Sequence, residues 1–247
     1  MQLTAVILTF NEAEHISACI QSLNWADRIV VVDSFSQDET VGLAGRAGAE
    51  IIQSPFQNYA QQRNVALDQV QSDWIFFVDA DERGTVALGQ EARMVMASRP
   101  EMGWQVARHN YIFGRLTRGA GWYPDYQLRL FRHGRVRYDR PVHEIALVDG
   151  AIGNLEQPLI HYNYRDLAHF QAKQQRYTTY DATILYQQGV KPKPYTFISQ
   201  PLRHFWWRFV TLAGYQDGGH GLRLSLYMAY YEWLKYRKLA ALLSGRG

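Results

Sequence analysis

The segment from Trp74 to Glu82 constrains this chain most, because an apolar β-type run ends there in three carboxylates within four residues. Carboxylates this close repel one another and lose hydration unless a positive charge offsets the loss. Asp79 and Asp81 lie two apart, so an extended segment projects both from one face, toward a hard cation with oxygen ligands. The pattern predicts a divalent metal, Mg²⁺ or Mn²⁺, that would also hold a diphosphate. The alternative is that these acids only solvate the start of a loop.

Strand-like runs alternate with helical patterns over the first 80 residues. The runs are Leu3 to Thr9, Arg28 to Val32, Glu50 to Gln53 and Trp74 to Val78. This alternation predicts βαβ units in an α/β fold with a mostly parallel central sheet, whose ligands gather at the carboxyl ends of the strands. The position of the acids after the fourth run therefore favours the metal interpretation. Two later runs, 105–113 and 126–132, are also strand-like.

Local signals place the first helices. Asn11 is an N-cap candidate with Glu14 three residues on, ahead of an apolar stripe that ends near Leu23 and includes Cys19. A buried structural thiol is expected there. A further helical pattern, 57–71, carries Arg63, which is either a solvated surface cation or a functional one.

Cysteine content and the N-terminus bear on the compartment. One cysteine in 247 residues excludes a disulfide within the chain, which suits a reducing environment. The first residues lack the apolar run and cleavage site of a secretion signal, because polar residues arrive by Asn11. We therefore expect a cytoplasmic protein.

The net charge of +3 conceals an asymmetric distribution. Residues 1–190 carry 17 basic and 21 acidic side chains, whereas residues 191–247 carry 9 and 2. Paired prolines near residue 192 mark a boundary, so we expect a catalytic domain over 1–190 and a helical extension over 191–247. Basic residues interleaved with Trp and Tyr in this extension predict a peripheral contact with the inner face of the plasma membrane.

The extension also has other interpretations. Its longest uncharged runs, such as 224–231, are far shorter than the roughly 20 apolar residues of a membrane span. The helices could instead pack on the catalytic domain with their cations in water. Single-stranded nucleic acid also suits basic and aromatic residues, but the body of the chain is acidic, so no nucleic-acid partner is expected.

Several motifs in order resemble family 2 glycosyltransferases of the GT-A fold, which is Rossmann-like. They are Val6-Ile7-Leu8-Thr9-Phe10-Asn11-Glu12, Val31-Val32-Asp33-Ser34, Gln62-Arg63-Asn64 and Asp79-Ala80-Asp81-Glu82. Residues 122–164, with Arg129-Leu130-Phe131, His143-Glu144 and His161-Tyr162, resemble the subgroup that includes bacterial lipopolysaccharide core β-1,4-glucosyltransferases.

The resemblance implies a donor site for a nucleoside diphosphate sugar, with UDP-hexose the default and adenosine or guanosine diphosphate open. The turn Thr9, Phe10, Asn11 and Glu12 would border base and ribose, and Asp33 would accept a hydrogen bond from the base. Arg63 would contact the diphosphate, and Asp79 and Asp81 would hold ribose and metal respectively. Arg129 belongs to a group of five arginines between 129 and 140 that could serve phosphate recognition or only form an exposed strand face.

Family 2 enzymes invert the anomeric centre, so a carboxylate must take the proton of the acceptor hydroxyl. Many members place this base in a Glu-Asp pair, which is absent between residues 83 and 190. Asp125, after Pro124, is the first candidate. Glu144 is the second, although His143 and Glu144 could instead complete the phosphate and metal end.

The resemblance implies transfer to a saccharide or lipid-linked acceptor in lipopolysaccharide core synthesis. A haloacid dehalogenase type phosphatase also has Asp-x-Asp after a strand, but it needs Thr where this chain has Arg83. A sugar nucleotidyltransferase would open with a glycine-rich loop, and residues 8–12 contain no glycine. A non-catalytic nucleotide-sugar-binding protein is the alternative from another class.

Overall fold

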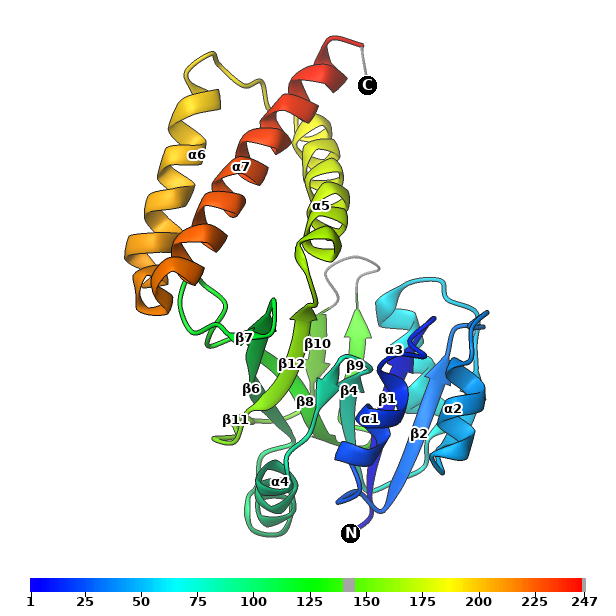
Figure 1. Ribbon diagram of the computed structural model, residues 1–247. Helices are drawn as coiled ribbons and strands as arrows, with labels where there is room; N and C mark the ends of the chain where they lie inside the picture. The colour runs from blue at the N-terminus through cyan, green and yellow to red at the C-terminus, as the bar shows by residue number, and fades with distance from the viewer. Residues whose placement is uncertain (140–144, 246–247) are drawn as a thin grey trace. The chain divides into compact units, whose positions relative to one another are not determined.

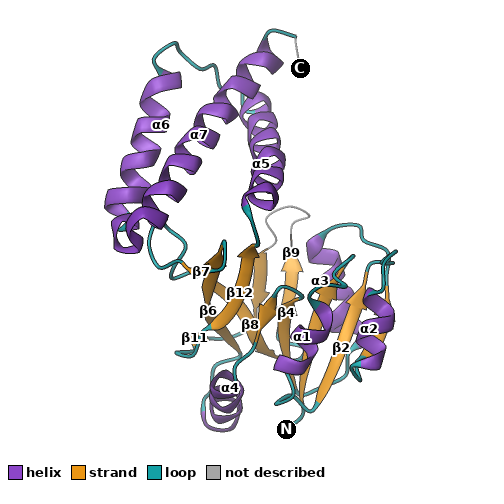
Figure 2. Ribbon diagram, viewed as in Figure 1, coloured by secondary structure: helices purple, strands orange, loops and turns teal. Residues whose placement is uncertain are grey.

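The computed structural model describes residues 1–139 and 145–245. The described chain divides into two compact units. Unit 1 comprises residues 1–108 and 125–161, and unit 2 comprises residues 109–124 and 162–247. The chain passes between the units three times: inside β6 (Gly103–Ile112), between Pro124 and Asp125, and inside β12 (Leu159–Tyr164). Strands β6 and β12 therefore contribute to both units. Figures 1 and 2 show the course of the chain.

The strands predicted in the first 80 residues are present and parallel. They are β1 (Leu3–Thr9), β2 (Arg28–Asp33), β3 (Glu50–Gln53) and β4 (Trp74–Asp79), in the spatial order β3-β2-β1-β4 (Figure 1). The order reverses at β1, whose neighbours are β2 on one side and β4 on the other. A reversal of this kind opens a crevice at the carboxyl ends of the strands, where ligands bind in α/β folds.

Beyond β4 the sheet becomes antiparallel. β8 (Tyr126–Arg132) pairs antiparallel with both β4 and β6, and the path continues through β12 to the short β5 (Glu82–Arg83). β11 (Ile152–Asn154) adds to β6, and β9 (Val136–Asp139) forms a separate ladder with β10 (Ile145–Val148). The expected strands over 105–113 and 126–132 are confirmed. The antiparallel pairing of β8 with β4 brings Arg129 next to Asp79 at the end of β4.

Helices cover both faces of the parallel half (Figure 2). One core joins that sheet to α1 (Ile16–Ser22), α2 (Thr40–Arg46) and α4 (Val86–Ser98). The other core joins the opposite sheet face to α3 (Tyr59–Gln69). Alternate residues of β1 enter alternate cores, Ile7 one and Val6 the other, as the period of a strand requires. Cys19 is fully buried, which confirms the structural thiol.

The expected N-cap of the first helix is wrong. α1 begins at Ile16 after His15, and no side chain caps it. Asn11 instead adopts a positive φ of 54°, and its Oδ1 accepts the backbone N–H of Gln37 at 2.8 Å. The hydrogen bond to a distant loop replaces the local cap, since a short polar side chain serves either purpose.

Unit 2 contains the C-terminal helical extension, which confirms that part of the predicted fold. Its elements are β7 (Arg115–Leu116), α5 (Leu167–Gln187), α6 (Thr196–Trp206), the π-helical turn η1 (Trp207–Thr211), the 3₁₀ turn η2 (Gly214–Asp217) and α7 (Gly218–Leu243). α7 packs on both α5 and α6 (Figure 1). The predicted division at residue 190 falls in the loop between α5 and α6, inside this unit, and stays a prediction. Over 1–139 and 145–245, the structure contains no helix with the length and hydropathy to cross a membrane.

Candidate active site

Strand register brings three of the predicted site residues to one edge of the sheet. Thr9 at the end of β1 lies opposite Asp33 at the end of β2. On the other side of β1, Leu8 lies opposite Asp79 at the end of β4. Thr9, Asp33 and Asp79 are therefore neighbours across adjacent strand ends, as the parallel arrangement predicts.

The turn after β1 and the loop after β2 are tied together by hydrogen bonds. The backbone N–H of Asn11 donates to Ser36 Oγ, and that of Glu12 donates to Thr40 Oγ1, each at 2.8 Å. Phe10 and Phe35 extend from these two segments with about half of each side chain exposed. Two half-exposed aromatic rings therefore lie on segments that are hydrogen-bonded to each other.

Asp33 organises the second of these loops. Its carboxylate is fully buried, and it accepts hydrogen bonds from the backbone N–H and the hydroxyl of Ser36 and, at 3.3 Å, from Gln53 Nε2. Buried carboxylates require such partners. Its predicted contact with a nucleotide base stays a prediction.

Asp79 faces two arginines. Arg129 Nη2 lies 2.6 Å from Asp79 Oδ2, and Arg63 Nη2 lies 3.6 Å from Oδ1. The guanidinium of Arg63 contacts two neighbouring rings, 5.2 Å from the centroid of Phe77 and 5.3 Å from that of Tyr138. Arg63 is therefore a buried, oriented cation and not a solvated surface residue. Burial alone would raise the pKa of Asp79, but Arg129 and Arg63 hold it below its ordinary value.

Glu82 is a site residue that the sequence did not predict. It connects the backbone of Asp79 to the side chains of Arg129 and Arg108. Its side chain is fully buried, and Oε2 accepts the backbone N–H of Asp79 at 2.9 Å. Oε1 accepts from Arg129 Nη2 and from Arg108 Nη1, the latter at 3.4 Å. Burial raises the pKa of Glu82, and the nearby Arg129 opposes this effect.

Arg108 links Glu82 to Asp125. Its Nε and Nη2 both donate to Asp125 Oδ2, at 2.8 and 2.5 Å, and Gln127 Nε2 donates to Oδ1 at 2.9 Å. Asp125 thus forms an ion pair with Arg108. Acidic and basic side chains therefore alternate in a continuous series of ion pairs, in the order Asp79, Arg129, Glu82, Arg108 and Asp125. No sequence signal marks Arg108, because it lies on a strand 17 residues from Asp125.

Asp81 and His161 form a second pair beside this network. His161 Nε2 lies 3.4 Å from Asp81 Oδ2, because the pairing of β12 with β5 places His161 opposite Glu82. The carboxylate of Asp81 suits Mn²⁺ or Mg²⁺ when phosphate oxygens and water supply the other ligands, whereas the imidazole of His161 is more compatible with the transition metal Mn²⁺ than with Mg²⁺. His161 was noted only within the resemblance, since 80 residues separate it from Asp81 in sequence.

Two predicted residues, His143 and Glu144, lie outside the described residues. Within 1–139 and 145–245, no group of three or more His, Cys, Asp or Glu side chains is arranged to hold a metal ion. Among the described residues, Asp81 and His161 are the pair that could share a cation, while Asp79 contacts Arg129 and Arg63.

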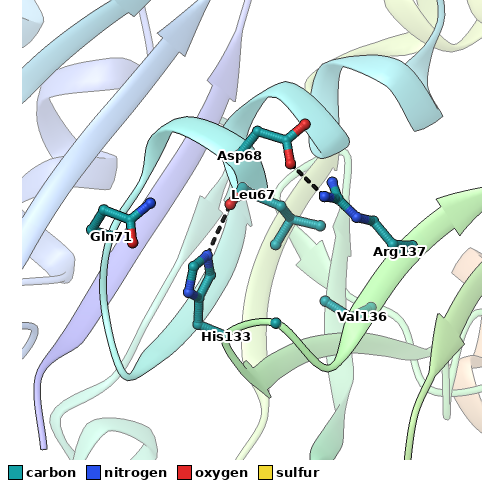
Figure 3. Close-up of a pocket in the computed structure, with 7 residues that line it drawn as sticks. Leu67, Asp68, Gln71, His133, Val136 and Arg137 are labelled. Atoms are coloured by element: carbon teal, nitrogen blue, oxygen red, sulfur yellow. Dashed lines mark hydrogen bonds and ion pairs between the residues drawn. The ribbon is translucent and has the colours of Figure 1, made fainter.

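Two hollows lie in unit 1. A hollow of about 210 Å³ is lined by Arg63, Arg129, Gln127 and Tyr138 among others, which places it beside the arginines that face Asp79. Another, of about 270 Å³, lies between the end of α3 and the β8–β9 turn (Figure 3). Its polar side chains bond to its own walls, His133 to the carbonyl of Leu67 and Arg137 to Asp68. The second hollow contains none of the predicted site residues.

Known proteins resemble the chain in both sequence and fold. The family model "Glycosyl transferase family 2" matches residues 4–83, the parallel half of unit 1 with Asp79 and Asp81. A lipopolysaccharide core biosynthesis glycosyltransferase, LpsC of Rhizobium meliloti, is 32% identical over 97% of this chain and 92% of its own length. An uncharacterised glycosyltransferase of Rickettsia bellii is 28% identical over 98% of this chain and 87% of its own.

Among solved structures, the mannosyltransferase PcManGT of Pyrobaculum calidifontis, in complex with GDP-Man and Mn²⁺, superposes with a TM-score of 0.56 at 14% identity. The superposition covers 97% of this chain and 87% of that one, and it shows a shared fold. The full-length similarity to LpsC, together with the match over β1 to β4, establishes that this chain belongs to glycosyltransferase family 2.

Proposed function

We propose that this glycosyltransferase is an inverting, metal-dependent hexosyltransferase that moves a sugar from a nucleoside diphosphate donor, with UDP-hexose expected, to a saccharide or lipid-linked acceptor of the lipopolysaccharide core. The name of the similar LpsC supports the pathway. The observation that carries the proposal is the position of Asp79 and Asp81 at the end of β4, beside Arg63 and Arg129. The single, buried Cys19 fits a cytoplasmic location.

The residues at the strand ends have distinct roles in this proposal. Phe10 and Phe35 flank the base, Asp79 accepts from the ribose, and Arg63 contacts the diphosphate. Asp81 and His161 hold the divalent cation, which would supply positive charge to the departing diphosphate. Arg129, largely buried beneath Asp79, orients that carboxylate and adds to the positive potential of the site.

Asp125 is the proposed base. Arg108 and Gln127 fix both of its oxygens, yet 26% of its side chain is exposed, so an acceptor hydroxyl can reach it. Proton removal at that hydroxyl makes the acceptor oxygen the nucleophile, which attacks the anomeric carbon as the bond to the diphosphate breaks. The attack on the face opposite the leaving group inverts the configuration.

Asp125→Asn is expected to lower the rate of transfer by about a hundred-fold to ten-thousand-fold, the usual contribution of a positioned base, while donor affinity stays within about two-fold. Transfer is followed by release of nucleoside diphosphate, and donor affinity by titration calorimetry. Asp149→Asn, at an exposed carboxylate that pairs with Arg135, is the matched control. If Glu144→Gln produces this pattern and Asp125→Asn does not, the base is Glu144.

A screen of nucleotides tests the donor class. UDP is expected to raise the apparent melting temperature in the presence of Mn²⁺ and to have less effect with EDTA, because binding to the folded state stabilises it by mass action. Adenosine and guanosine diphosphates are the comparison set. Release of pyrophosphate from a nucleoside triphosphate and a sugar phosphate would favour the nucleotidyltransferase alternative. Donor binding without hydrolysis or transfer would favour the non-catalytic one.

A further inference from the structure

Helix α6 has an exposed apolar face. Tyr195, Ile198, Leu202 and Trp206 follow one another at intervals of three, four and four residues, so they share one side of the helix. Each of these side chains is 63 to 68% exposed, and no residue of α6 is buried. These four residues are called the α6 stripe below. Single exposed apolar residues are ordinary, but a continuous row indicates a surface that contacts another apolar phase.

The half-buried side of α6, away from the stripe, combines the apolar Phe197, Pro201 and Phe205 with His204, and α6 packs on α7. His204 Nδ1 lies 3.9 Å from a carboxylate oxygen of Glu232 on α7, and Arg208 Nε donates to His204 Nε2 at 2.8 Å. Burial, together with Arg208, lowers the pKa of His204 to about 4, so the imidazole is neutral at pH 7. The α6 stripe is therefore apolar surface that α6 exposes in addition to the half-buried side on which it packs.

Basic residues accompany the stripe. Lys191 and Lys193, in the segment before α6, are exposed, and Lys193 Nζ lies 5.9 Å from the ring centroid of Tyr195. Arg203 is exposed on the flank of α6, within the extension that carries 9 basic and 2 acidic side chains. Cations beside an apolar row that includes Tyr and Trp complement an anionic, amphipathic surface.

We propose that α6 is an interfacial helix whose stripe enters the boundary between headgroups and acyl chains of an anionic bilayer. Tyr195 and Trp206, at the two ends of the row, suit the headgroup level, while Ile198 and Leu202 between them are purely apolar. Lys191, Lys193 and Arg203 lie against the anionic headgroups. This proposal adds a partner of unit 2 to the proposed function and does not rest on the donor chemistry of unit 1.

The test is sedimentation of the full-length protein with vesicles of phosphatidylcholine alone or mixed with phosphatidylglycerol. The protein is expected to bind the mixed vesicles at least ten-fold more strongly, and Leu202→Asp is expected to reduce this binding at least ten-fold. Met94→Asp, at an exposed apolar position on α4 of unit 1, is the matched control and should bind like the parent. Because Leu202 is exposed, its replacement should leave the circular dichroism spectrum unchanged.

The double variant Lys191→Glu, Lys193→Glu lies outside the helix, so it tests the electrostatic part without disturbing α6. It should bind the mixed vesicles at least five-fold more weakly, with little change on neutral ones.

Equal binding of the parent, Leu202→Asp and the double variant would overturn the proposal, as would failure of the parent to bind. Light scattering that shows a dimer which Leu202→Asp dissociates would assign the stripe to a second copy of the chain. The shift in melting temperature with UDP and Mn²⁺ should be the same in all these variants, which separates this test from that of the donor site.

Discussion

Asp81→Asn is expected to lower metal-dependent transfer about a thousand-fold, the upper range for loss of one preorganised electrostatic contact to a leaving group. The amide keeps the shape of the carboxylate but lacks the charge that a hard divalent cation requires. The stabilisation of the protein by UDP should also lose its dependence on Mn²⁺. Rates are measured as release of nucleoside diphosphate across a titration of Mn²⁺.

The control for this substitution is Asp68→Asn on α3. Asp68 is about half exposed and pairs with Arg137, away from Asp81. It should retain the activity of the parent within two-fold. If Asp81→Asn keeps both its activity and its response to Mn²⁺, Asp81 does not bind the metal, and the roles proposed for Asp81 and His161 are wrong.

Arg129→Met is expected to reduce the free energy of unfolding by about 3 to 5 kcal/mol. Arg129 is 2% exposed, and its Nη2 contacts both Asp79 and Glu82. Without the guanidinium, Glu82 stays fully buried, and the more distant Arg108 is its remaining arginine partner among the described residues. Urea denaturation measures the loss, which should appear as a lower midpoint with an unchanged slope.

The pH dependence of this variant provides a second readout. Burial raises the pKa of Glu82 in the folded protein, and the removal of Arg129 takes away the charge that opposes the effect. A folded-state pKa above the unfolded value means that the folded state binds more protons, so stability increases as pH falls through that pKa. Arg129→Met should therefore recover part of its lost stability as pH falls from neutral toward the ordinary pKa of a glutamate.

Arg132→Met is the matched control, since Arg132 lies on the same strand but is exposed. Its stability should stay within about 0.5 kcal/mol of the parent, as for most surface substitutions. Equal denaturation midpoints for the two variants would show that the contacts of Arg129 with Asp79 and Glu82 do not contribute to stability.

Much of unit 1 could be predicted from local patterns. Strand β1 and strand β3 have the predicted ends, and β4 extends one residue beyond its predicted end to include Asp79. Short apolar runs of this kind predict strands from sequence alone. If the strands are parallel, their carboxyl ends lie at the same edge of the sheet. The cap assigned to Asn11 failed because a residue 26 positions away competes for the same side chain.

The candidate site divides in the same way. Asp79 and Asp81 could be predicted as site residues because two acids directly after an apolar strand are unusual without a positive partner. Glu82 is adjacent to them, but its burial is not readable from the sequence, and Arg108 and His161 carry no local signal at all. Their places follow from the pairing of β6 with β8 and of β12 with β5.

The sequence by itself determined the parallel half of the sheet, the acids at its edge and the charge of the C-terminal extension, because each depends on residues close together in the chain. Only the tertiary structure decided which charges neutralise one another and which side of α6 is exposed. Ion pairs such as Arg108 with Glu82, and the outward turn of the α6 stripe, depend on distances between segments that are remote in sequence. Local propensity contains no information about those distances, since they are set by strand register and helix packing.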